Sequence, residues 1–419
     1  MKNLAVIGLI WVGCAIAWII LGSTVVVRSG DSSSALTEEV HLLWGPPHTQ
    51  SPPRAIWRST EKRRQRVTSY TPQGTPVESD VEREEVVEHA LPLVKSDVAV
   101  KLALEQRQKG LLWFPTYAVD FRGAYAVEND SGARRAVDIV FPLAAQNAVY
   151  DGFRVTRPDG SAVAARVENG RAVVTDELAP GERRELVVAY RSRGTSTWRY
   201  ELTAGTGQVR DFHLAMDTDF AAVDFPAGTL SPTRHRATGD RWRGEWRFET
   251  LVANAPIGVT LPSRLNPGPL AARITFFAPV GLLFFFFVIA NFATVRKVRL
   301  HPLNYFFFGA AFFAFHLLFS YLVDHLAILP AFAVAAAASI VLVVTYARLF
   351  VGWRFALREM GIAQLIYLVL FSFTFFWQGF TGLAITVGAV LTLAVMMQVT
   401  GRAQRAATER ATTERAVSG

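Results

Sequence analysis

The sequence predicts an α+β membrane protein with an N-terminal transmembrane helix, a periplasmic antiparallel β-sandwich-like domain and a C-terminal five-helix transmembrane bundle. Three observations predict this class: a long uncharged run near the N-terminus, a middle stretch in which apolar and charged residues alternate, and further apolar runs before the C-terminus. A chain of 419 residues that is 51% hydrophobic could also form two soluble domains. The clustering of the apolar residues excludes this, because a soluble protein could not cover so much apolar surface.

The first apolar run covers residues 4–27 and contains no charged residue. A spanning helix needs about 20 such residues, because the hydrocarbon core is about 30 Å thick and a helix rises about 1.5 Å per residue. A cleaved signal peptide is the alternative, but Ser23–Val27 contains no small-x-small cleavage site and the run is too long. We therefore expect an uncleaved anchor. The only cysteine, Cys14, lies in this run, so no intrachain disulfide can form.

Five further apolar runs predict the spans of the bundle, at 274–293, 303–323, 326–350, 362–377 and 380–399. Basic residues occupy every second connection, namely Lys2, Arg296, Lys297, Arg299, Arg348, Arg354, Arg358, Arg402, Arg405, Arg410 and Arg415. The positive-inside rule then puts both termini in the cytoplasm and residues 28–270 in the periplasm of a bacterium. Arg273 is the exception, and its side chain can reach the interface from the outer end of its span.

The net charge of +8 suggests nucleic-acid binding until the charges are located. Residues 28–270 contain 31 Lys and Arg against 31 Asp and Glu, so the excess lies entirely in the membrane portion. Basic residues beside membrane spans report orientation. We expect the lipid bilayer as a partner and no nucleic acid.

The stretch between the first and second spans has two parts. Residues 28–82 are rich in proline and arginine, and the prolines between 46 and 76 predict an irregular linker over 44–80. From residue 83 the period is two: Trp198 and Tyr200 alternate with charged neighbours, as do the tryptophans of 242–249. Asn169-Gly170 between two short apolar runs predicts a tight hairpin.

The predicted order is therefore an anchor at 1–27, a periplasmic linker at 28–82, a periplasmic β-rich domain at 83–270, a five-span bundle at 271–400 and a cytoplasmic polar tail at 401–419.

No phosphate-loop, zinc-protease, hydrolase or paired-cysteine motif occurs in the sequence. Asp217, Asp219 and Asp224 are close enough in sequence to hold a hard cation, but no glycine turn or terminal glutamate accompanies them. We interpret them as solvated turn residues. We expect no catalytic residue, no cofactor and no metal.

Three polar residues of the bundle remain as candidate functional residues: His316, Asp324 and His325. An ionisable side chain near mid-membrane is costly, so His316 should face other helices. It could relay a proton or substrate, or it could be a neutral imidazole bonded across helices. Asp324 and His325 end the same span, where they could bind a metal or simply cap the helix at the interface.

Several segments resemble the inner membrane CreD family, often labelled cell envelope integrity proteins. The segments that carry the resemblance are LNPGPLAARITFFAPVGLLFFF at 265–286, HPLNYFFFGAAFFAFHLLFSYLVDHL at 301–326 and the closing hairpin over 364–402, with looser matches at 38–50, 104–125 and 220–233. Around 46–58 the chain departs from the family pattern. The resemblance implies a bacterial cytoplasmic-membrane protein linked to envelope integrity and stress tolerance, without established catalytic residues.

Three functions remain open on the sequence. The leading hypothesis is a non-enzymatic inner-membrane protein that supports envelope integrity or stress tolerance through contacts of its periplasmic domain with envelope or membrane proteins. The second is a transporter or flippase-like protein that uses His316. The third is a membrane-embedded enzyme that uses His316, Asp324 or His325. The oligomeric state is not predicted.

Overall fold

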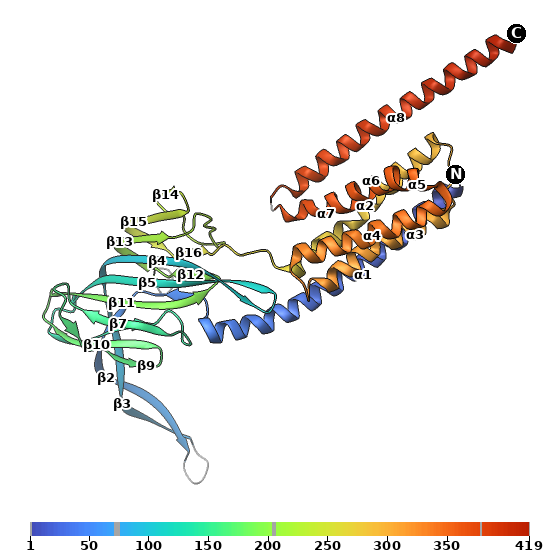
Figure 1. Ribbon diagram of the computed structural model, residues 1–419. Helices are drawn as coiled ribbons and strands as arrows, with labels where there is room; N and C mark the ends of the chain where they lie inside the picture. Colours follow the sequence, from blue (N-terminus) through green and yellow to red (C-terminus); the bar gives the residue numbers. More distant parts are fainter. Residues whose placement is uncertain (1, 71–75, 203–206, 378, 419) are drawn as a thin grey trace. The chain divides into compact units, whose positions relative to one another are not determined.

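A computed structural model describes residues 2–70, 76–202, 207–377 and 379–418 (Figure 1). The chain forms two compact units. The helical unit comprises Met1–Ala35, Gly110–Leu112 and Leu265–Gly419, and the β unit comprises Leu36–Lys109 and Trp113–Arg264. Helices at both ends and sheets in the middle confirm the α+β class.

Within the described residues, six helical segments are long and apolar enough to cross a membrane, which agrees with the predicted spans. They are α1 (Lys2–Trp44), α2 (Pro267–Val295), α3 (Pro302–Leu322), α4 (Ile328–Val351), the composite segment Trp353–Phe376 and α8 (Thr381–Ser418). The composite segment is built from α5 (Trp353–Phe355), η1 (Ala356–Gly361), α6 (Ile362–Gln364), η2 (Leu365–Leu370), α7 (Phe371–Phe373) and η3 (Thr374–Phe376).

Small residues allow the helices of this unit to approach closely. A Cβ atom on Gly281 of α2 would lie 2.5 Å from the carbonyl oxygen of Tyr367, and one on Gly309 of α3 would lie 2.8 Å from Cys14 Sγ. Small side chains at such contacts are typical of membrane helices, because association there depends on close packing.

The interior of the helical unit is largely aromatic. Trp18, Phe285, Phe308, Phe312 and Phe315 are among the largest fully buried side chains of the protein. Their rings pack edge-on or tilted, as between Phe285 and Phe312, whose centroids are 4.8 Å apart. A continuous apolar core therefore connects α1, α2 and α3.

The first helix is longer than predicted. It continues from the apolar run through Arg28 and Asp31 to Trp44. No proline interrupts residues 28–44, and the first strong breakers are Gly45, Pro46 and Pro47. The loss of apolar character at residue 28 marks the end of a membrane-type composition without ending the helix.

Strands of the β unit form three sheets in the described residues. The three-stranded sheet has the order β1 (His48–Gln50), β12 (Thr197–Tyr200), β16 (Ile257–Thr260). The five-stranded sheet has the order β3 (Pro76–Leu91), β2 (Arg54–Tyr70), β6 (Arg135–Pro142), β10 (Arg171–Leu178), β9 (Arg166–Glu168). The eight-stranded sheet has the order β14 (Arg234–Thr238), β15 (Arg241–Ala253), β13 (Gly207–Thr218), β4 (Leu93–Lys109), β5 (Leu112–Glu128), β11 (Arg183–Thr195), β7 (Tyr150–Thr156), β8 (Ala162–Val163).

The predicted alternation is confirmed on these strands. Trp198, Tyr200 and Trp246 are fully buried, while the charged residues between them are at most half-buried. The Asn169-Gly170 turn is confirmed as well: it joins β9 to β10, and both residues have positive φ, 48° and 70°.

Two strand pairs depart from the antiparallel expectation. β1 pairs with β12 in parallel, and β13 pairs with β4 in parallel. Both pairs join segments more than 100 residues apart, as in the contact of His48 with Trp198 and of Phe212 with Ser96. Parallel neighbours need long connections, which the intervening strands supply.

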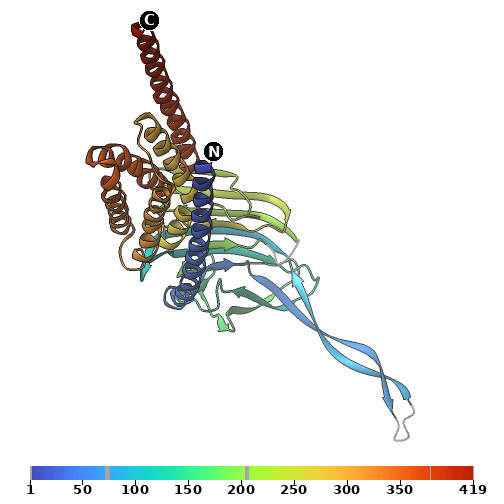
Figure 2. The ribbon, with the colours of Figure 1, turned by 90° about the vertical axis from the view of Figure 1, so that its right-hand side faces the viewer.

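The irregular structure expected at 44–80 is wrong for most of that stretch. β2 and β3 pair over their whole lengths and extend as a two-stranded ribbon from the other strands of the β unit (Figure 1, Figure 2). Pro52 and Pro53 precede β2 and Pro76 is the first residue of β3, so they do not interrupt the pairing, while residues 71–75 of the expected linker lie outside the described residues. Cross-strand ion pairs support the ribbon, for example Arg63 with Glu85 at 3.2 Å and Arg64 with Glu82 at 3.3 Å.

A buried polar network holds the short strand β1 in the β unit. Gln50 accepts a hydrogen bond from Tyr190 Oη at 2.7 Å and donates to the Pro142 carbonyl at 2.9 Å. The backbone amide of His48 donates to Tyr117 Oη at 3.2 Å. Burial lowers the pKa of His48 to about 4, so this imidazole is neutral at physiological pH.

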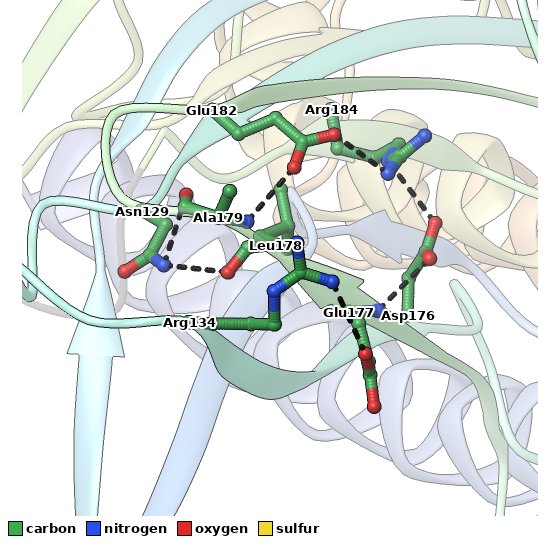
Figure 3. A network of polar contacts seen from close by, with 8 residues as sticks. All are labelled: Asn129, Arg134, Asp176, Glu177, Leu178, Ala179, Glu182 and Arg184. Carbon is green, nitrogen blue, oxygen red and sulfur yellow. Dashed lines mark hydrogen bonds and ion pairs between the residues drawn. The ribbon is translucent and has the colours of Figure 1, made fainter.

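A second network closes the turn between β10 and β11 (Figure 3). Asn129 Nδ2 donates to the Leu178 carbonyl at 2.9 Å, and Glu182 accepts from the Ala179 amide at 2.8 Å. Arg184 lies between Glu182 and Asp176, at 2.9 Å and 3.0 Å. All partners satisfy backbone groups or each other, so we interpret this network as structural.

Candidate functional site

His316 lies in the interior of the helical unit, as the sequence predicts. It is 1% exposed, and its Nδ1 lies 2.8 Å from the Phe312 carbonyl one turn earlier in α3. The ring packs edge-on against Trp18 of α1 and Phe315. Among the described residues, neither His316 Nε2 nor Trp18 Nε1 has a hydrogen-bond partner. The imidazole is therefore satisfied on one side by its own helix and enclosed by aromatic rings on the other.

Asp324 forms an ion pair with Arg28 of α1, with 3.1 Å between the nearest atoms. The same guanidinium donates to the Ser320 carbonyl at 2.7 Å and lies over the Tyr321 ring, 4.6 Å from its centroid. Arg28 thus covers the last turn of α3, where free carbonyls and their dipole favour a cation. This arrangement is a helix cap, and it ties α1 to α3.

The three candidate residues do not form one site. His325 is exposed beside Asp324, just past the end of α3, whereas His316 is buried inside α3, eight residues before Asp324 or about 12 Å along the helix axis. In the described part of the chain, no three His, Cys, Asp or Glu side chains lie together in a way that could hold a metal ion. The arrangement supplies no paired acid and base for catalysis.

A second polar contact, between Gln364 and Ser339, joins helices of the helical unit. Gln364 Nε2 donates to Ser339 Oγ at 2.8 Å, and Ser339 Oγ donates to the Ala311 carbonyl at 2.6 Å. The chain of bonds connects three helical segments inside an apolar core. Such bonds hold membrane helices together.

The acidic cluster of the sequence separates in space. Asp217 lies 3.6 Å from Arg243, Asp219 accepts a hydrogen bond from the Leu104 amide at 2.8 Å, and Asp224 accepts one from the Phe225 amide at 2.9 Å. Each carboxylate is thus engaged with a different partner.

The β unit has a groove of about 1170 Å³ on the eight-stranded sheet. Its lining includes outward-facing side chains of β14, β15, β13, β4, β5, β11 and β7, which lie side by side in that order (Figure 1). The end of α1, at Leu42–Gly45, and the loop residues Asn147 and Val149 complete the lining. Ligand pockets usually measure about 300–1,000 Å³, so the groove has room for a sizeable molecule.

Charged side chains form a row across the floor of this groove. Strand register places Arg236 opposite Arg243, Arg243 opposite Asp217, and Asp217 opposite Lys101. Further along the sheet, Asp120 is opposite Arg191, which pairs with Asp151 at 2.5 Å. The charged side chains lining the groove are Lys101, Asp120, Asp151, Arg191, Arg193, Asp217, Asp219, Arg236, Arg241 and Arg243, so cations exceed carboxylates.

Sequence reasoning did not find this groove. Its charged residues alternate with core residues, which is also the pattern of any solvated sheet face. The signal in the sequence was the apolar run Leu42-Leu43-Trp44 directly before Gly45 and two prolines, outside any apolar span.

The C-terminal part of the chain has a known relative. Residues 228–404 match the model of a family described as inner membrane protein CreD. The match begins in the last strands of the β unit and extends through the spans from α2 into α8. No curated protein matches the chain.

Solved structures share only a loose likeness with it. A protein from Legionella pneumophila described as a candidate nutrient binding protein is 10% identical, covers 47% of this chain and 74% of its own, and has a TM-score of 0.29. An M1 zinc metallopeptidase from Deinococcus radiodurans is 14% identical, covers 41% of this chain and 42% of its own, and has a TM-score of 0.25. This chain therefore spans less than half the length of that peptidase, and likenesses of this degree carry no functional conclusion. The match of residues 228–404 to the CreD inner membrane protein family and the six apolar helices of the described residues agree with the resemblance of the sequence, and together they support a multi-pass membrane protein.

Proposed function

We propose that this protein belongs to the CreD family and supports bacterial envelope integrity without catalysing a reaction. The β unit is the working part and contacts envelope or membrane proteins, and the helical unit anchors it in the cytoplasmic membrane. Both termini are cytoplasmic, and the residues between the first and second spans are periplasmic, since basic residues occupy alternate connections.

The single observation that carries this proposal is the contrast between the closed interior of the helical unit and the open groove on the β unit. Aromatic side chains fill the core of the helical unit around α1, α2 and α3, and its buried polar groups bond mainly to nearby backbone. The β unit instead has an open, charge-lined groove of about 1170 Å³. A transport route would need polar groups along a path through the bundle, whereas an anchor needs tight apolar packing.

A transporter or flippase-like function remains the second candidate because of one specific observation. His316 and Trp18 each keep a buried ring nitrogen without a partner among the described residues, and unpaired buried polar atoms often mark functional positions. The same two rings can equally be held by their edge-on aromatic contact, with a centroid distance of 5.5 Å.

Complementation of a deletion strain separates the two functions. The wild-type gene, His316→Phe and the groove variant Arg236→Glu are compared for survival of envelope stress, with equal membrane levels verified by immunoblot. We expect His316→Phe to complement and Arg236→Glu to fail. Loss of complementation by His316→Phe together with full complementation by Arg236→Glu would reject the anchor proposal in favour of the relay.

The orientation has its own test. A membrane-impermeant thiol reagent should label an engineered cysteine at Val252, which is 67% exposed on β15, in intact spheroplasts of a Cys14→Ala background. A cysteine at Arg402, beyond the last span, should react only after lysis. The opposite labelling pattern would reject the proposed threading.

A further inference from the structure

The groove on the eight-stranded sheet differs in chemistry between its two ends, and we propose that it binds an anionic amphiphile, a molecule with a phosphate- or carboxylate-type head and an alkyl chain. This inference rests on the proposed function, in which the β unit is the working part. The head would lie over β14 and β15, and the chain would lie toward β7 and the end of α1.

The cationic end is built from three arginines. Arg236 of β14 is directly opposite Arg243 of β15, and Arg241 lies on the same face two residues before Arg243. Like charges directly opposite each other on adjacent strands are destabilising. Asp217 and Glu245 neutralise Arg243, at 3.6 Å and 3.1 Å.

Arg236 and Arg241 remain exposed, and neither forms an ion pair with a carboxylate of the described residues. A bound anion would relieve the repulsion at this end, and guanidinium groups suit phosphate and carboxylate because they offer paired donors.

The apolar end is formed by exposed apolar side chains. Leu42 is 73% exposed, Leu43 is 61% exposed and Val149 is 81% exposed, and all three line the groove. Gly45 fixes the position of the helix end above β11: it has a φ of 97°, and a Cβ there would lie 2.1 Å from the Arg193 carbonyl oxygen. Such an exposed apolar group beside a groove is typical of a binding surface.

The distance between the two ends requires a long alkyl chain. The lined strands run from β14 to β7, six neighbouring spacings of about 4.8 Å, which is about 29 Å before twist. The helix end lies at β11, four spacings or about 19 Å from β15, which is about the length of an extended 16-carbon chain. In the middle of the groove, Lys101 and Asp120 lie on neighbouring strands, and Arg191 is paired with Asp151. The middle is thus close to charge balance, and Arg193 adds a further cation near the helix end.

The test uses the full chain in nanodiscs of phosphatidylcholine and three probes: hexadecyl phosphate, hexadecylphosphocholine and inorganic phosphate. Binding heats are corrected with empty nanodiscs. We expect hexadecyl phosphate to bind the wild type at least tenfold more tightly than either inorganic phosphate or hexadecylphosphocholine. Equal affinities for hexadecyl phosphate and inorganic phosphate would overturn the role of the apolar end, and equal affinities for the two hexadecyl compounds would overturn that of the cationic end.

Matched variants locate the site. Arg236→Glu should weaken hexadecyl phosphate binding at least tenfold, while Arg247→Glu, the same change on β15 outside the groove lining, should leave it unchanged. Leu42→Asn should weaken binding several-fold, while Val252→Asn, at an exposed site outside the lining, should not. Groove variants that bind like the wild type would refute the site. Because all four positions are exposed, a folding defect is not expected, and thermal unfolding verifies this for each variant.

Nanodiscs that contain phosphatidylglycerol distinguish a lipid of the bilayer from a soluble amphiphile as the bound molecule. If the groove takes its occupant from the surrounding bilayer, these discs should lower the apparent affinity for hexadecyl phosphate; an unchanged affinity assigns the site to a soluble amphiphile. The binding assay is independent of the envelope phenotype, so the two proposals can fail separately. A groove variant that still binds the probe but fails to complement would reject the amphiphile and leave the proposed function intact. A groove variant that loses binding but complements fully would reject the proposed function and leave the ligand assignment intact.

Discussion

The helical unit and the β unit bury polar side chains in opposite ways. In the helical unit most of these bonds are local: Thr275 donates to Ala271, and Thr392 donates to Gly388, each one turn earlier in its own helix. In the β unit the buried bonds connect distant segments, as between Tyr190 and Gln50, which are 140 residues apart.

The difference follows from the two solvents. Lipid offers no hydrogen bonds, so a polar side chain on a membrane helix is already paired with its own backbone before the helices meet. Water drives apolar residues of the β unit together, and polar groups enclosed by that collapse need partners wherever the fold provides them. Equivalent substitutions should therefore cost more stability in the β unit than in the helical unit.

The largest effect is expected at Trp246, in the core of the β unit. Its side chain is fully buried, and its indole donates to the Leu230 carbonyl at 2.9 Å. Trp246→Ala should lower the free energy of unfolding by about 3–5 kcal/mol through a cavity and a lost bond. Thermal unfolding of the β unit in the full protein, followed by near-ultraviolet circular dichroism, measures the loss.

Trp246→Phe serves as the graded control. It keeps most of the volume and removes the indole donor, so the loss should be clearly smaller than for Trp246→Ala. A Trp246→Ala protein as stable as the wild type would show that this residue is not part of a cooperative core.

The next effect is a pH dependence that the β unit should show. The unfolded chain protonates His48 below its ordinary pKa of 6.5, whereas burial lowers the pKa in the folded state to about 4. The unfolded state thus binds more protons in this window, and stability should fall as the pH drops from 6.5 to 4, by at most about 3 kcal/mol for this group.

His48→Gln should flatten that dependence, because glutamine does not titrate. Denaturant unfolding at several pH values between 4 and 7 gives both curves. An unchanged slope in the variant would assign the pH dependence to other groups.

A matched pair of glutamines compares the two units directly. Gln50→Leu leaves Tyr190 Oη and the Pro142 carbonyl unpaired in the β unit and should cost about 1–3 kcal/mol. Gln364→Leu removes the bond to Ser339 in the helical unit and should cost about 0.6 kcal/mol, the typical size for a bond between membrane helices. Unfolding of both variants in the same lipid or detergent gives the ratio, and equal losses would contradict the contrast between the units.

Local signals in the sequence predicted much of this fold. The apolar runs located the spans, the period of two located strands such as β15, and Asn169-Gly170 located a hairpin. Each of these signals is contained within a few neighbouring residues, so it needs no knowledge of the partner.

The pairing of strands that are distant in sequence could not be predicted from local patterns. The groove exists because β13 pairs in parallel with β4, which brings Asp219 to the Leu104 amide across 115 residues. The sequence did not predict the ribbon of β2 and β3. Prolines at its ends indicated an irregular segment, and the charges of each strand are paired only with charges of the other strand. His316 was correctly placed inside the bundle, but its neighbour Trp18 comes from a helix almost 300 residues earlier.

The smallest effect is expected where the helical unit carries a charge pair. Arg28 and Asp324 are 34% and 46% exposed, so water screens their attraction, and Arg28→Gln should lower stability by about 1 kcal/mol or less. A double-mutant cycle with Asp324→Asn isolates the pair from the contacts of Arg28 with Ser320 and Tyr321. A coupling energy of several kcal/mol would mean that the pair is shielded from water. A long-range polar contact at the end of α3 would then stabilise the helical unit as strongly as such contacts stabilise the β unit.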